Sequence, residues 1–316
     1  MKVGNPLILS DTVLIREDTG PIYFDSSRLQ SPNREALVVT EARFYAAYPV
    51  GITAIGLSGA HLGYEARISL NVGPYIMCEK VPIWGLEPSR DAYMENPGYM
   101  LSCFRWRFMR PLFIPPGTGF SAAITRSLVP NVLSTFIDTA CPISCTFVAR
   151  VVEGDYPRSM VVPYAISWAP VPVEPAVTTV DRMAGIDLQN NLDKPVELKY
   201  AIGRMARIRN LNNASPGPMA VTLDVMGAAA YAATGLSALC QFQFDNEVVA
   251  PTGTQFNAIF DYARRCLPLA NVELRPGQRP LFRMSAQTGN VASAPPIYRY
   301  WAPNVTLVGY RKEATP

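Results

Sequence analysis

The sequence contains very little histidine and little charge. His61 is the only histidine among 316 residues, and Asp, Glu, Lys and Arg together make up 17% of the chain. Bicupins, which are metalloenzymes with two similar domains, bind each metal ion through several histidines and a carboxylate. A pair of such sites is therefore excluded. The net charge of +3 is also too small to indicate a nucleic-acid-binding protein.

The sequence also lacks paired cysteines, a secretion signal and a long apolar run. Its six cysteines include no C-x-x-C pair, and Cys141 and Cys145 are too far apart for a disulfide if they lie on one strand. The segment 1–6 has no apolar region before a cleavage site. The best candidate for a membrane span, 225–240, is uncharged but rich in alanine, glycine and threonine, and it is too short. We expect all six cysteines to be reduced and buried in an intracellularly made protein.

Apolar residues, proline and glycine are abundant. The chain is 49% hydrophobic and contains 29 prolines and 21 glycines, so turns should be frequent and long helices rare. The combination of low charge and high apolar content predicts more buried surface than two separate domains require. Extensive subunit contacts are therefore expected.

A proline-glycine turn occurs twice in the sequence. The runs 115–120 and 274–282 each contain a Pro-Gly pair, and the two pairs are 160 residues apart. Thr146-Phe147-Val148-Ala149 matches Thr306-Leu307-Val308-Gly309 at the same spacing. About half of the chain separates each pair of matches, which predicts a tandem duplication of one all-β unit.

Alternation of apolar and polar residues indicates half-buried strands throughout the chain. The clearest case is 64–72, and in 36–46 the alternation places Val38, Thr40, Ala42 and Phe44 on one face. Other strands are expected at 12–15, 22–24, 104–108, 145–151, 196–202, 221–225, 240–244 and 305–308.

Two segments depart from this pattern. Trp84–Gly98 contains prolines and glycine and is expected to be a long surface loop. Thr252-Gly253-Thr254-Gln255 fits a capping box, and apolar residues follow at helical spacing up to Leu267. One short helix is therefore predicted there.

The expected domains are a first unit, 1–152, a proline-rich connector, 153–194, and a second unit, 195–316. The connector contains five prolines but is too apolar for a free linker. Each unit offers seven or eight short strands, which suits a two-sheet jelly roll. The predicted fold is all-β, with two tandem jelly-roll β-barrels or sandwiches, a proline-rich connector and few short helices.

This plan resembles the double jelly-roll major capsid proteins of icosahedral viruses, the adenovirus hexon-like lineage that includes small lipid-containing bacteriophages. The resemblance covers nearly the whole chain and rests on the architecture, on the hairpins 112–125 and 274–285, and on the last strand of each half. It implies a homotrimer of pseudo-hexagonal outline that tiles an icosahedral shell.

The resemblance further implies a structural protein of the virion, made in the host cytoplasm, without catalytic, cofactor-binding or metal-binding residues. Its main partner would be itself. Minor capsid or vertex proteins and an underlying lipid membrane are further partners that the family implies, whereas no specific nucleic acid is expected. The connector and the loop 84–98 are candidate inter-subunit surfaces.

Two alternatives remain open at this stage. One is a carbohydrate-active jelly-roll protein, either a glycan hydrolase or a lectin, and the other is a minor virion spike or vertex protein. Hydrolysis of glycans needs paired carboxylates, and the candidates, all in expected loops, are Glu87, Asp91, Glu95, Glu153 and Asp155. A Ser-His-Asp triad would have to use His61, and 56–59 lacks the nucleophile spacing.

Basic and aromatic residues are mixed at Arg105, Trp106, Arg107 and Arg110, a combination that can bind nucleic acid. The favoured interpretation is a strand with Trp106 inward and the arginines outward, where they could pair with acids of a neighbouring subunit. Asn213 and Asn304 match the glycosylation pattern, but neither is expected to be used without a secretion signal.

Overall fold

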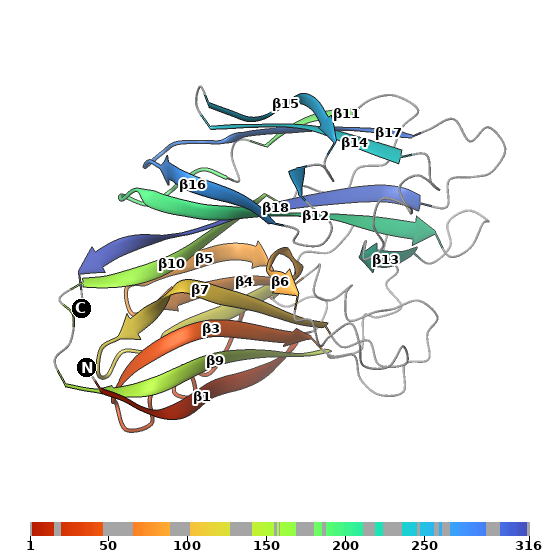
Figure 1. Ribbon diagram of the computed structural model, residues 1–316. Coiled ribbons are helices and arrows are strands. Elements are labelled where there is room, and N and C mark those ends of the chain that lie inside the picture. Colours follow the sequence, from red (N-terminus) through yellow and green to blue (C-terminus); the bar gives the residue numbers. More distant parts are fainter. Residues whose placement is uncertain are drawn as a thin grey trace. The chain divides into compact units, whose positions relative to one another are not determined.

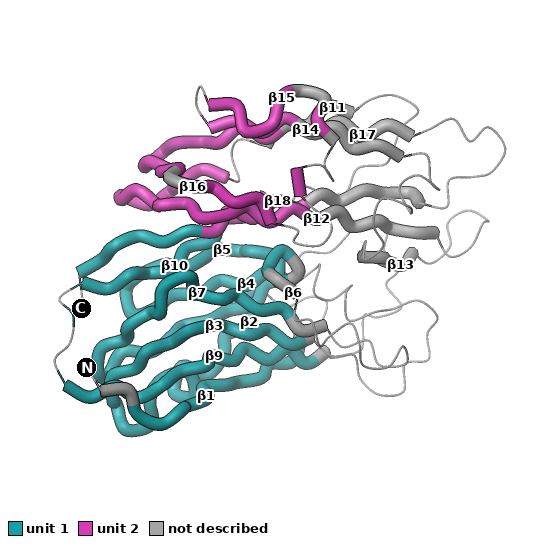
Figure 2. Tube along the Cα trace, in the orientation of Figure 1, with its two compact units in different colours: residues 1–128, 134–165, 309–316 teal, residues 129–133, 166–308 magenta. Residues whose placement is uncertain are grey.

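The computed structural model of the protein (Figure 1) describes residues 2–15, 20–46, 66–88, 102–126, 141–154, 157, 159–168, 180–184, 188–210, 219–223, 236–244, 247–255, 259–260, 266–288 and 298–314. These residues form β-strands with turns between them, one short 3-10 helix, Ile83–Gly85, and a helical residue at Ile259. The chain divides into two compact units, which Figure 2 distinguishes by colour. Unit 1 comprises residues 1–128, 134–165 and 309–316, and unit 2 comprises residues 129–133 and 166–308.

Unit 1 contains two sheets. The first has the order β1 (Lys2–Ile15), β9 (Cys141–Glu153), β3 (Ala36–Ala46), β7 (Ser102–Ile114) and β6 (Glu87–Pro88). The second has the order β2 (Ile22–Tyr23), β8 (Phe120–Arg126), β4 (Ala66–Val72) and β5 (Tyr75–Pro82). β5 also pairs with β10 (Ser159–Trp168), where Ala165, which belongs to unit 1, lies opposite Cys78. Without the two-residue β6, and apart from the parts of β10 and β18 (Tyr298–Ala314) that belong to unit 1, the described strands of unit 1 number eight. Counted along the chain, the sheet orders are first-eighth-third-sixth and second-seventh-fourth-fifth.

Unit 2 repeats this strand order. Its first sheet has the order β10 (Ser159–Trp168), β18 (Tyr298–Ala314), β12 (Val196–Asn210) and β16 (Cys266–Leu274), with β13 (Met219–Leu223) also paired to β12. Its second sheet has the order β11 (Val180–Ala184), β17 (Leu281–Thr288), β14 (Leu236–Phe244) and β15 (Glu247–Gln255). Without β13, these orders are again first-eighth-third-sixth and second-seventh-fourth-fifth. β10 and β18 also contribute residues to unit 1.

This arrangement of eight strands in two sheets is the jelly roll, and it confirms the predicted fold class. The repeated Pro-Gly turn joins the sixth strand to the seventh in both units. Thr118 N–H donates to the Pro115 carbonyl at 3.2 Å, and Gln278 N–H donates to the Arg275 carbonyl at 3.0 Å. In each turn the glycine has a positive φ, 76° at Gly117 and 73° at Gly277. Proline followed by a left-handed glycine is the type II turn.

The core of unit 1 follows the predicted alternation. Ala66, Ile68, Leu70 and Val72 on β4 are fully buried, and the residues between them are half-buried. On the facing sheet, Phe147 stacks on Phe120 of β8, with ring centroids 3.6 Å apart. Alternate residues of the two sheets thus meet in one apolar layer.

Aromatic side chains form much of the core of unit 2. The Trp168 and Phe282 rings lie 5.0 Å apart, and the Phe242 ring lies 5.8 Å from that of Phe282. On β12, Val196, Leu198, Tyr200 and Ile202 are buried, as the sequence predicts. On β18, every residue from Asn304 to Val308 is buried, so this segment is covered on both faces.

One predicted strand face is wrong because β3 contains a bulge. Its pairing with β9 shifts between Val39 and Glu41, so Thr40 is an extra residue that is exposed. Leu37 and Val39 are buried before the bulge, and Ala42 and Phe44 are buried after it. A single inserted residue reverses the side-chain alternation, so Val38 and Thr40 do not share a buried face with Phe44.

The predicted helix start at 252–255 is also wrong. These residues end β15, and the Thr254 hydroxyl donates to the Pro251 carbonyl at 2.7 Å. Pairing with β14 favours the strand, and such long-range pairing outweighs a local capping pattern. Within the rest of the predicted helix, the structure describes Ile259, which is helical, Phe260, which is at a bend, and β16 from Cys266 onward. Ile259 and Phe260 are both buried.

Other segments contain more strand than expected. The range 153–194, predicted as a connector, contains β10, whose residues 159–165 belong to unit 1, and β11. The predicted loop 84–98 contains the end of the 3-10 helix and β6, and residues 89–98 lie outside the described residues. Cys78 and Cys145 are buried as predicted, whereas Cys266 is only half-buried. Burial of the other three cysteines falls outside the described side chains.

Candidate interaction surface

The first sheet of unit 1 has an outward side made of alternate residues. The residues between them point into the core, as the burial of Leu9, Phe147, Ala42 and Trp106 shows. We call the outward residues of the four long strands the outer face. By pairing register it consists of Ile8, Ser10, Thr12, Leu14, Ser144, Thr146, Val148, Glu41, Arg43, Tyr45, Arg105 and Arg107.

Large apolar side chains are exposed on this sheet. Ile8 and Leu14 are each 56% exposed, Tyr45 is 37% exposed, and Met109 of β7 is 62% exposed. Among the described residues only two other large hydrophobic side chains are exposed, Tyr23 and Val248. Scattered exposed apolar residues need no explanation, but a concentration on one sheet is typical of an interaction surface.

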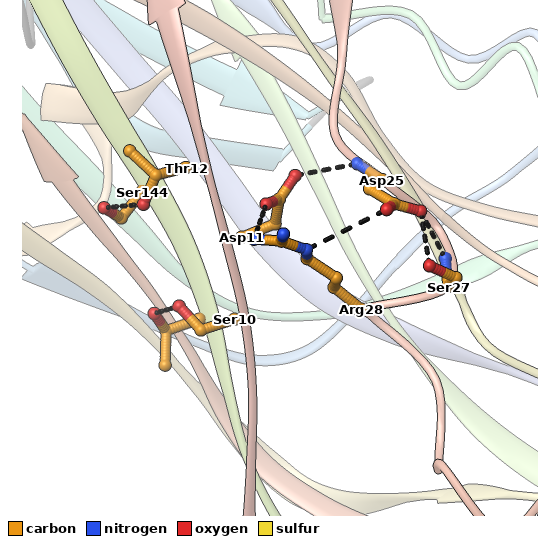
Figure 3. A network of polar contacts seen from close by, with 8 residues as sticks. Ser10, Asp11, Thr12, Asp25, Ser27, Arg28 and Ser144 are labelled. Atoms are coloured by element: carbon orange, nitrogen blue, oxygen red, sulfur yellow. Dashed lines mark hydrogen bonds and ion pairs between the residues drawn. The ribbon is translucent and has the colours of Figure 1, made fainter.

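Two hydroxyl pairs cross from β1 to β9 between Ile8 and Leu14. Ser10 Oγ lies 2.7 Å from Thr146 Oγ1, and Thr12 Oγ1 lies 2.8 Å from Ser144 Oγ. Figure 3 shows these contacts beside the polar network of Asp11. Each hydroxyl therefore has a protein partner and does not depend on water for a hydrogen bond.

Charged residues dominate the other half of the outer face. Arg43 lies directly opposite Arg105 across the β3–β7 pairing, and Glu41 lies opposite Arg107. The Glu41 carboxylate pairs with the Arg43 guanidinium, and its second oxygen lies 3.8 Å from Arg107 Nε. Glu87 is opposite Arg105 on its other side, in β6. The arginines outnumber the carboxylates, so this half of the face is cationic.

Strand β1, which is an edge of this sheet in the described part of the chain, carries two features that hinder strand addition. Pro6 cannot donate a backbone hydrogen bond, and Asp11 points inward with 8% exposure. Asp11 Oδ2 accepts the Asp25 N–H at 2.8 Å, and Asp11 Oδ1 lies 3.3 Å from Arg28 Nη1 (Figure 3). Prolines and inward charges on edge strands are known protections against edge-to-edge pairing.

Asp25 anchors the loop that follows β2. Its Oδ1 accepts the Ser27 hydroxyl at 2.7 Å and the Ser27 N–H at 2.9 Å, and the hydroxyl bond is the main reason that the pKa of Asp25 is lowered. Arg28 Nε lies 3.9 Å from Asp25 Oδ2. This loop therefore holds Arg28 in place beside the Asp11 carboxylate.

The candidate carboxylates are placed next to basic residues or are not described. Glu87 lies opposite Arg105, and Glu153 lies opposite Lys2 at the end of β9. His61, Asp91, Glu95 and Asp155 lie outside the described residues. In both described cases, the strand register places the carboxylate opposite a basic residue.

The mixed basic and aromatic segment is a strand, as favoured. Trp106 is 2% exposed and Phe104 and Phe108 are buried with it, while Arg107 is exposed. The Arg110 guanidinium lies 4.7 Å from the centre of the Tyr310 ring. The inward side of β7 therefore builds the core, and its arginines point outward.

Asn304, one of the two glycosylation matches, is buried in β18. Its Nδ2 donates to Ser167 Oγ at 2.7 Å and to the Trp168 carbonyl at 3.2 Å. A fully buried side-chain nitrogen offers no room for a glycan. Asn213 lies outside the described residues.

The hydroxyl pairs are the part of the surface that sequence reasoning missed. Ser10 and Thr12 alternate with apolar residues, as do Ser144 and Thr146. The two patterns could have been noticed, but only the strand register shows that they pair.

Among the described residues, no group of three or more His, Cys, Asp or Glu could hold a metal ion. No helix in that part of the chain is long and apolar enough to cross a membrane.

Comparison with known proteins finds matches among solved structures alone. No protein-family model and no curated protein matches the chain. Among solved structures, the mavirus major capsid protein is 9% identical, with 96% of this chain and 90% of that chain covered and a TM-score of 0.33. The Sputnik virophage structure is 7% identical, with 99% and 87% covered and a TM-score of 0.32.

A third similar structure is described as the triple jelly-roll fold and turret assembly of an archaeal virus. It is 10% identical, with 99% of this chain covered and a TM-score of 0.20. This chain spans only 60% of that one. The jelly-roll assignment itself rests on the strand order within each unit.

Proposed function

We propose that this protein is a viral major capsid protein that assembles as a homotrimer. The observation that carries the proposal is the repetition of one eight-strand jelly-roll order in a single chain. Three such chains around a closed threefold axis bring six similar jelly rolls together. Six similar units approximate a hexagon, and a hexagonal outline allows trimers to tile a shell.

The finer features follow from the same resemblance. The shell would be icosahedral and of the small, lipid-containing bacteriophage type, and the protein would be located in the virion after synthesis in the host cytoplasm. Its work would be structural rather than enzymatic. Neighbouring trimers would be its first partners, and minor capsid or vertex proteins and an underlying membrane would be the others.

Light scattering on the purified chain tests the trimer. One chain has a mass of 34.7 kDa, so three chains have a mass of about 104 kDa. We expect a stable species of that mass, with a hexagonal outline in negative-stain images of the same peak. A monomer that persists at high concentration, and that forms no sheets or shells, contradicts the proposal. A monomer that also hydrolyses or binds glycans supports the carbohydrate-active alternative.

A further inference from the structure

We infer that the outer face of unit 1 is covered by a second copy of this chain. The inference rests on the proposed function, because it names the partner surface within that assembly. It concerns Ile8, Ser10, Thr12 and Leu14 of β1 and the outward residues that follow them across β9, β3 and β7.

The two units carry a similar polar pattern, which is exposed in unit 1 and buried in unit 2. Ser144 and Thr146 on β9 are 160 residues before Asn304 and Thr306 on β18, and both strands are the eighth of their unit. In unit 2, Asn304 Nδ2 donates to Ser167 Oγ, and Ser167 Oγ lies 3.1 Å from Thr306 Oγ1. The first and eighth strands of each unit are thus joined by side-chain hydrogen bonds, and the eighth-strand residues that take part match at this spacing.

Burial distinguishes the two copies of this pattern. Asn304 and Thr306 are 0% exposed, whereas Ser10 and Thr12 are exposed and their partners on β9 are half-buried. These exposures refer to one chain alone. The groups that cover the pattern in unit 2 therefore belong to this chain, which shows that its own side chains can pack on such a face.

The outer face is prepared for burial without loss of hydrogen bonds. Ser10 bonds to Thr146 and Thr12 bonds to Ser144, so removal of water leaves none of these four hydroxyls without a partner. An unpaired buried polar group would oppose association, and a paired one costs little. Ile8 and Leu14 supply the apolar area at the two ends of this patch.

Contact through the face is favoured over contact through the edge. Pro6 and the inward Asp11 hinder the addition of another strand to β1, although this strand has no partner on its other side among the described residues. Side chains of the outer face carry no such obstacle. The second copy should therefore pack against the sheet and not extend it.

Charge also fits a second copy. The cationic half of the face, with Arg43, Arg105 and Arg107, calls for an apolar surface that carries carboxylates. The chain offers this combination on β15, where Glu247 is exposed beside Val248, which is 52% exposed. β15 is an edge strand of the second sheet of unit 2.

The test compares two variants by sedimentation across a range of protein concentrations. Ile8→Lys with Leu14→Lys places two charges on the outer face, and we expect the dissociation constant of the oligomer to rise about 100-fold or more. Tyr23→Lys is the control, because Tyr23 is 69% exposed and belongs to the other sheet of unit 1. The control should assemble like the natural sequence. Circular dichroism establishes that both variants are folded.

Oxidative footprinting of the unaltered protein gives an independent measurement. Met109 is 62% exposed in the single chain, and we expect its oxidation to slow at least fivefold on assembly, while Tyr23 stays reactive. If Met109 is equally reactive in the oligomer, and the lysine variant assembles normally, the inference is overturned while the trimer stands. If the unaltered chain never associates, the proposed function fails first.

Discussion

Arg43 and Arg105 face each other directly across the pairing of β3 with β7, on the outward side of the first sheet of unit 1. Like charges at directly opposite positions destabilise a sheet. Glu41 offsets this repulsion, because its carboxylate pairs with Arg43 and lies 3.8 Å from Arg107. The bulge at Thr40 places Glu41 in this position, where its side chain is only 12% exposed.

Replacement of Glu41 by glutamine should therefore destabilise unit 1. The change keeps the shape of the side chain but removes the charge between two arginines, and we expect a loss of about 1–2 kcal/mol because the arginines remain partly exposed. Urea denaturation measures the loss. Glu153→Gln is the matched control on an exposed carboxylate, and equal midpoints for the two variants would contradict the role of Glu41.

The two Pro-Gly turns should be equally sensitive to alanine. Gly117 and Gly277 have positive φ, and an added Cβ meets no atom within 4 Å at either position. The cost of Gly117→Ala or Gly277→Ala is thus backbone strain alone, about 1–2 kcal/mol. Gly20→Ala has the same open space without a positive φ and should change stability by less than about 0.5 kcal/mol. Midpoints of unfolding that do not separate the turns from Gly20 would refute this explanation.

Much of the fold could be predicted because its signals are local. The alternation in 64–72 identified β4, and the turn residues at 116–117 and 276–277 identified the same hairpin in both halves. The spacing of 160 residues also related β9 to β18 correctly. In each of these cases, neighbouring residues alone determine the preference.

The features that the sequence did not predict depend on contacts between residues far apart in the chain. The bulge at Thr40 exists only relative to β9 and β7, so no pattern within 36–46 reveals it. The capping pattern at 252–255 was overridden by pairing with β14. The same reason applies to the interaction surface. The hydroxyl pair of Ser10 and Thr146 joins residues far apart in sequence, and its exposure differs from that of its counterpart in unit 2.

Stability should fall at alkaline pH because of the buried thiol of Cys78. Burial is the main cause that raises its pKa from 9.0 to about 12. Between these values the unfolded chain loses the thiol proton and the folded chain keeps it. The contribution of this group to the free energy of unfolding is therefore fully present below pH 9 and declines as the pH rises toward 12. Tyr164, whose pKa burial raises from 10.0 to about 12, adds to the decline above pH 10.

The Cys78 contribution can be isolated by substitution. Between pH 8 and pH 10.5, under reducing conditions, Cys78→Ala should lose about 2 kcal/mol less stability than the natural sequence. Cys266→Ala serves as the comparison, because Cys266 is only half-buried. Urea unfolding at both pH values measures the difference. An identical pH dependence in Cys78→Ala and in the natural sequence would show that the buried thiol of Cys78 does not contribute to the loss of stability at alkaline pH.

The ion pair of Arg311 and Glu313 should be the most sensitive polar contact in unit 1. Arg311 Nε donates to Glu313 Oε1 at 2.5 Å, and the two side chains are 3% and 4% exposed. The guanidinium also lies 5.5 Å from the centre of the Tyr164 ring. Glu313→Gln leaves a buried positive charge without its counter-ion, which costs about 3–5 kcal/mol.

A control and a rescue separate this effect from a general weakness of the strand. Lys312 lies between the two residues but is exposed, so Lys312→Gln should change stability by less than about 0.5 kcal/mol. The double variant Arg311→Met with Glu313→Leu removes both charges and should be more stable than Glu313→Gln, since apolar residues can replace a buried pair. If the double variant is the less stable of the two in urea, the buried charge does not cause the loss of stability in Glu313→Gln. Altered packing around β18 must then cause it.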